Sequence, residues 1–148
     1  MRKVSSFSLA TLVALATGLV ARPAYPLALD AQFDCKSDAH TFIETLVTDQ
    51  YIDPNPMRVE ANSVNAFRPV RGRDLTVFGF RVYAVLGYQQ DDAMFKKGNG
   101  EAAASSIYGA VVSGPAETVK LRVTQAGSDA IVRQVMPLIL TAIVCSDH

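Results

Sequence analysis

Tryptophan is absent from this chain of 148 residues, which contains only two cysteines and two histidines. An excess of charge of either sign is also lacking, because 14 lysines and arginines balance 14 aspartates and glutamates. Nucleic-acid-binding domains and polybasic membrane anchors carry a surplus of positive charge. The composition therefore argues against nucleic acid and against an electrostatic membrane anchor as partners.

Sequence motifs that carry chemistry are missing as well. No serine lies in a Gly-x-Ser-x-Gly elbow, and the cysteines form no Cys-x-x-Cys pair. The spacing of cysteines and histidines fits no closed zinc site, and Asp91, Asp92 and Glu101 lack the spacing of a calcium loop. The run Lys96–Gly100 lacks the residue order of a phosphate-binding loop. We therefore expect no cofactor, no metal ion and no enzymatic activity.

The N-terminal segment has the pattern of an export signal. A basic start, Met1–Lys3, precedes an uncharged apolar block, Val4–Ala21, which is followed by Arg22 and two prolines. Prolines after the apolar block suit a cleavage region better than a continuing membrane span, although a retained anchor is the alternative. We expect a periplasmic or secreted protein whose mature chain does not insert stably into a membrane.

Three alanines, Ala21, Ala28 and Ala31, are candidate ends of the leader, and we choose Ala31. Residues 1–31 then form the signal peptide and residues 32–148 a single exported α+β domain. Both cysteines, Cys35 and Cys145, lie in the exported part, and an even count in an oxidising compartment predicts one disulfide. It would close a loop of about 110 residues and stabilise the fold by roughly 4–5 kcal/mol in the chain-entropy model. A redox-active or nucleophilic thiol is the alternative.

Periodicity predicts two helices. Apolar residues at positions 35, 39, 42, 43 and 46 form a helical stripe, so we expect a helix over 35–51 that Asp34 caps and Asp53–Pro56 ends. The segment 116–126 alternates like a strand but has helix-end signals in Pro115 and Gly127, which favour a helix.

Strand patterns occupy the rest. Alternation begins at Met57, the run Leu75–Gln89 predicts the central strand with a bend at a glycine, and 107–112 predicts a short strand. The apolar run 130–145 contains Pro137, which favours one strand or two joined at a bulge over a helix. The sum is an α+β fold: an antiparallel or mixed sheet of about four strands, an N-terminal helix, and a second helix in a C-terminal β-α-β unit with parallel strands, stapled by one disulfide.

Two loops are candidates for binding a partner. Arg68, Arg71 and Arg73 present three forked donors that suit carboxylates on a protein or an anionic glycan. The alternative is a solvated loop that Asp74 partly neutralises.

The second loop, 89–100, is long for a compact domain. Its Met94 and Phe95 stand among charged residues, beside Lys96 and Lys97. These two apolar residues would anchor a partner if exposed, or cap the sheet if folded back.

These features favour an exported, non-catalytic binding domain, such as an inhibitor or immunity-type protein, that docks loops 68–74 and 89–100 onto a protein partner. We expect a monomer or weak dimer. The alternative is a small-ligand-binding protein or enzyme with a pocket between sheet and helices, to which His40 or Tyr83 would contribute. Glu44 lies four residues after His40, on the same side of a helix. Its carboxylate would either orient the imidazole for chemistry or form an ordinary pair with it at the solvent edge.

Overall fold

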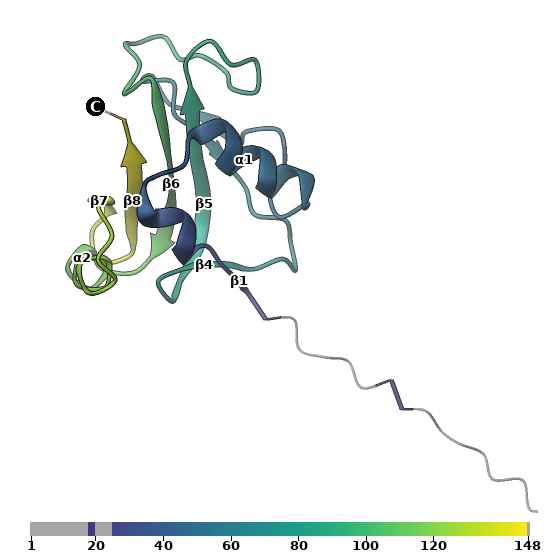
Figure 1. Ribbon diagram of the computed structural model, residues 1–148, viewed down its shortest axis with the longest axis vertical. Helices are drawn as coiled ribbons and strands as arrows, with labels where there is room; N and C mark the ends of the chain where they lie inside the picture. The colour runs from purple at the N-terminus through teal and green to yellow at the C-terminus, as the bar shows by residue number, and fades with distance from the viewer. Residues whose placement is uncertain (1–17, 20–24, 148) are drawn as a thin grey trace, which may run out of the picture.

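The structure, a computed structural model, describes residues 18–19 and 25–147, so most of the predicted leader lies outside the described residues. The elements of the described part follow one another along the chain as shown in Figure 1. They are β1 (Leu27–Ala28), the 3-10 helix η1 (Asp30–Asp34), α1 (Ala39–Thr48), β2 (Arg58–Val59), β3 (Asn65–Phe67), β4 (Leu75–Val77), β5 (Phe80–Gln89), β6 (Ser106–Ser113), α2 (Ala116–Gln125), β7 (Ile131–Met136) and β8 (Leu140–Ser146).

The described residues form one mixed sheet of eight strands, so the α+β class is confirmed and the expected number of about four strands is wrong. Its order is β1-β4-β5-β6-β8-β7, with β3 paired to β5 and β2 paired to β3. All neighbours are antiparallel except β1 and β4, which run parallel. Two of the additional strands arise because the expected strands at 75–89 and 130–145 each divide into two. The other two, β1 and β3, are two and three residues long, too short to show the alternation by which a strand is recognised in sequence.

The first helix begins later than expected. Asp38, not Asp34, is its N-cap, and the Asp38 carboxylate accepts a hydrogen bond from the Thr41 amide at 2.8 Å. Cys35 lies outside the helix, in the left-handed conformation that ends η1. The predicted stripe is otherwise correct, since Phe42, Ile43 and Leu46 are buried. α1 packs across β5 and β6 (Figure 1).

The predicted central strand Leu75–Gln89 is a hairpin. Phe78 and Gly79 have φ values of 48° and 85°, and Val77 pairs with Phe80. Two successive positive φ values match the right-handed twist of paired strands, and glycine adopts them without a steric penalty. The chain therefore reverses at Gly79, one of the two glycines, Gly79 and Gly87, at which the sequence suggests a bend or a close backbone approach, whereas Gly87 lies within β5.

The C-terminal β-α-β unit differs from the expectation. α2 forms over the predicted segment, with Val119 and Val123 buried, but the last strand is antiparallel to β6, as the pair Tyr108↔Cys145 shows. The apolar run 130–145 reverses at 137–139, so β7 and β8 form a hairpin. β7 is the strand that runs parallel to β6, and β8 lies between them.

Both α-helices cover the same face of the sheet. Their buried residues belong to one core cluster with Tyr108, Val112 and Ile143. The opposite face has a second, smaller cluster in which Ala84, Val111 and Ala142 lie beneath other apolar strand residues, and this cluster contains no helical residue. We call this the helix-free face. Within the described ranges, no helix has the length and apolarity needed to cross a membrane.

Candidate functional site

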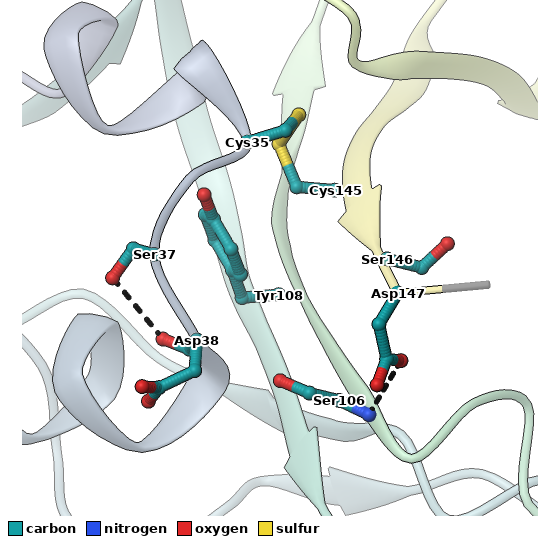
Figure 2. A pocket seen from close by; sticks show the side chains of 8 residues that line it. All are labelled: Cys35, Ser37, Asp38, Ser106, Tyr108, Cys145, Ser146 and Asp147. Atoms are coloured by element: carbon teal, nitrogen blue, oxygen red, sulfur yellow. Dashed lines mark hydrogen bonds between the residues drawn. A yellow bond between two sulfur atoms is a disulfide. The ribbon is translucent and has the colours of Figure 1, made fainter.

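The predicted disulfide is confirmed. Cys35 and Cys145 are joined by an S–S bond of 2.02 Å across a sequence separation of 110. Figure 2 shows the bridge at one wall of a cleft of about 200 Å³, with Tyr108, Ser106 and Asp147 along it. The bridge ties the segment that precedes α1 to the end of the last described strand.

Polar groups of this cleft bind the segments that precede α1 and follow β8. The Tyr108 hydroxyl donates to the Gln32 carbonyl at 2.8 Å, and burial raises the pKa of Tyr108. The Ser106 amide donates to Asp147 at 2.8 Å, while the Ser106 hydroxyl accepts from the Ala39 amide at 3.0 Å. These bonds fasten β6 to both ends of the domain, which is a structural role.

The imidazole of His40 lies between two carboxylates. Its Nδ1 is 2.5 Å from Oδ2 of Asp92, and its Nε2 is 3.5 Å from Oε2 of Glu44. The Asp92 hydrogen bond is the main cause that raises the pKa of His40, against a smaller opposing effect of desolvation. The imidazole bonds to no hydroxyl or thiol of the described residues, so it has no nucleophile to activate there. The pair instead fastens the loop after β5 to α1.

The loop 89–100 folds back onto the sheet. Phe95 is 6 % exposed, and its ring packs edge-on against the rings of Phe67 and Tyr88. The Asn65 side chain bonds both the amide and the carbonyl of Lys96 at 3.0 and 2.8 Å. Phe95 therefore caps the sheet and Met94 is half-buried against the core.

The charged residues that follow Phe95 in this loop remain at the surface. Lys96 and Lys97 are exposed.

The three arginines have different surroundings. The Arg73 guanidinium lies 4.0 Å from the centre of the Tyr51 ring, a cation–π contact, and Arg71 is exposed. Asp74 pairs with Arg81 at 3.4 Å instead of with one of the three. Arg68 lines a groove on the helix-free face.

That groove has a volume of about 330 Å³ and crosses β3, β5, β6 and the β7–β8 hairpin. Arg58 and Glu60 pair with each other at 2.6 Å, whereas the Arg68 guanidinium has no hydrogen bond or ion pair to any residue in the described ranges. The groove is otherwise lined by apolar side chains: Met57, Ala66, Tyr83, Ala84, Leu86, Val111, Val135 and Leu140.

Exposed apolar residues continue from the groove onto the turn of the β7–β8 hairpin. Val135 lines the groove and is 54 % exposed, and Leu138 at the turn is 80 % exposed. This surface was not predicted from the sequence, because the run 130–145 has the composition of a buried strand. Pro137, which interrupts the run, is the signal that marks the turn.

Comparison of the chain with protein-family models, curated proteins and solved structures found no match. Among the residues that the structure describes, no three histidine, cysteine, aspartate or glutamate side chains are grouped to hold a metal ion. The candidate site is therefore defined by its geometry.

Proposed function

We propose that this protein is an exported, non-catalytic binding domain of the inhibitor or immunity type, which docks a protein partner on its helix-free face. The observation that carries the proposal is the apolar groove beside the unpaired guanidinium of Arg68. The predicted leader and the disulfide support a periplasmic or secreted location, because structural disulfides persist in oxidising compartments.

The helix-free face is too apolar for an ordinary solvent-facing surface. An antiparallel sheet covered on one side normally presents polar residues on the other. Here Tyr83 is 58 % exposed and Val135 54 %, next to the partly buried Leu86 and Leu140. A contiguous apolar patch with charged residues at its rim is the usual mark of a protein-binding surface.

Arg68 specifies the charge of the partner. A guanidinium binds carboxylates through two parallel hydrogen bonds, and this one forms no ion pair within the described residues, since Glu60 of the same groove pairs with Arg58. We therefore expect a partner segment that places one or two apolar side chains in the groove and a carboxylate over Arg68. Of the two predicted docking loops, 68–74 contributes through Arg68, whereas the buried Phe95 of 89–100 offers no surface anchor.

Site-specific photo-crosslinking tests this proposal. A photoreactive phenylalanine analogue at position 83, in the groove, is expected to give a defined protein adduct in the envelope of the cells that make the protein. The same analogue at Thr124, exposed on α2, is the control and is expected to give none. Equal adducts at both positions, or none at position 83, would contradict the proposal.

A matched pair of charge reversals separates the arginines. Arg68→Glu is expected to abolish the adduct, while Arg71→Glu, three residues along the same loop and outside the groove lining, is expected to leave it intact. Loss with Arg71→Glu alone would move the site to the loop. A small molecule that co-purifies and is seen by native mass spectrometry would instead favour the alternative, a small-ligand-binding protein.

A further inference from the structure

β7 is the last strand of the sheet at one side and has a single partner, β8, among the described residues. In Figure 1 it lies at the margin of the fold, beyond β8. The backbone N–H and C=O groups on the outer edge of such a strand are free to pair with another strand. β7 is six residues long, and all its residues except Val132 are exposed.

Register places the side chains of β7 on two faces. Ile131 pairs with Val144 and Arg133 with Ala142, residues of the helix-free cluster, whereas Val132 packs against the main core. Asp129 lies two residues before the start of β7, in the connection from α2, and pairing with another strand that extends β7 backwards by two residues would place it on the same face as Ile131 and Arg133. That face then reads acid, apolar, base at every second position.

We propose that the segment 129–133, which includes the first three residues of β7, pairs with the same segment of a second copy of this chain, antiparallel, about a two-fold axis that passes through Ile131. In this register Arg133 of each copy lies directly opposite Asp129 of the other, and the two Ile131 side chains meet at the axis. Asp129 and Arg133 are both exposed, and neither has an ion pair or side-chain hydrogen bond within the described part of the chain. The charges are thus self-complementary, as a two-fold interface requires.

Other registers lack this complementarity. An axis through Arg133 places two guanidiniums opposite each other, and an axis through Val132 places Arg133 opposite Ile131. An axis through Gln134 pairs more of β7 but places Arg133 opposite Val135 and forms no ion pair. Opposite charges across a strand pair are stabilising and like charges destabilising, so the charge pattern favours the register centred on Ile131. Because Asp129 and Arg133 are not groove-lining residues, substituting them tests the dimer without changing the lining of the proposed partner site.

Charge exchange tests the register. Analytical ultracentrifugation of the oxidised protein over a range of concentrations is expected to show a weak dimer whose association falls as salt rises. Arg133→Asp and Asp129→Arg should each weaken association by about tenfold, because each creates like-charge pairs across the interface. The double exchange should restore the parental dissociation constant, and circular dichroism confirms that each variant is folded.

A cysteine scan gives an independent readout. Ile131→Cys is expected to give a covalent dimer under mild oxidation, because the two residues meet at the axis. Leu121→Cys on α2, where the side chain is 57 % exposed against 36 % for Ile131, is the control and should stay monomeric although its thiol is more accessible. A parent that is monomeric at about 1 mM, a dimer that ignores both charge reversals, or equal crosslinking through position 121 would each overturn the proposal.

Discussion

His40 is the one histidine among the described residues, and its charge responds to pH near neutrality. Its pKa is raised above the ordinary value of 6.5, mainly by the Asp92 hydrogen bond, with smaller contributions from the charges of Asp92, Glu44 and Asp38. A raised pKa in the folded state means that this group stabilises the fold fully below pH 6.5 and loses that contribution as pH rises through the folded value. The free energy of unfolding should therefore fall as pH rises through the folded pKa of His40. Asp92→Asn should make this fall smaller, because it removes the main hydrogen bond to the imidazole.

The measurement is an NMR titration in a His148→Gln background, where His40 gives the only imidazole signals. We expect its pKa above 6.5 in the parent and lower in Asp92→Asn. Glu44→Gln also removes one negative charge but leaves the Asp92 hydrogen bond in place, so it should lower the pKa of His40 less than Asp92→Asn does. Equal pKa values in the parent and in Asp92→Asn would contradict the geometry around His40.

Gly109 allows two central strands to approach each other. A Cβ at this position would lie 2.2 Å from the carbonyl oxygen of Ile143 on β8, so backbone would have to move. Gly109→Ala is expected to reduce the free energy of unfolding by about 1–3 kcal/mol, the usual cost of overpacking. Urea denaturation measures it, with the exposed Ser113→Ala on the same strand as control; an unchanged midpoint would refute the contact.

Residue by residue, the sequence predicts what local spacing encodes. With only two cysteines, one intramolecular disulfide is possible. Glu44 lies one helical turn after His40, so their contact follows from spacing alone. Asp92, the stronger partner of His40, is 52 residues away, and only the position of the loop after β5 brings it there. The cation–π contact of Arg73 likewise depends on where Tyr51 lies, which spacing does not reveal.

Among the elements, β1 bears on the maturation of the chain. Leu27 and Ala28 pair with β4, and Leu29 is 2 % exposed with its amide bonded to the Thr76 carbonyl at 2.8 Å. Cleavage after Ala31 would remove this strand and expose its apolar contacts, at a cost of about 1.5–3 kcal/mol for Leu29 alone.

We therefore predict that processing occurs upstream of Leu27, and Ala21 is the candidate end of the leader that leaves β1 whole. Intact-mass spectrometry of the exported protein checks this. A mature chain that begins at residue 32 and unfolds at the same denaturant concentration as one that begins at residue 22 would show that β1 is dispensable.

Long periodic elements were predictable and short ones were not. α1 follows a helical stripe, whereas α2 was predicted from its helix-end signals and β6 from a short apolar run, and in each case the element exists and only its ends shifted. The strands β1 to β4 have two or three residues each, and tertiary pairing rather than local pattern defines them. The direction of β8 was missed because a two-strand hairpin and a single strand share the same composition.

For the molecule as a whole, the disulfide is expected to contribute a large part of the free energy of unfolding. Reduction is expected to lower the free energy of unfolding by about 4–5 kcal/mol, because it frees a loop of 110 residues in the unfolded chain. Guanidinium titration with and without reductant measures the change, and a Cys35→Ser, Cys145→Ser variant should match the reduced protein. A reduced protein as stable as the oxidised one would show that the bridge is not a principal determinant of stability.

The position of the bridge also determines how the domain bears mechanical load. Because it joins Cys35 to Cys145, nearly all of the folded body lies inside one covalent ring. Tension applied outside these two residues passes through sulfur, and the hydrogen-bonded ladders between them carry almost none of it. A motor that unfolds proteins by pulling on either end would have to thread a closed loop or wait for a reductant.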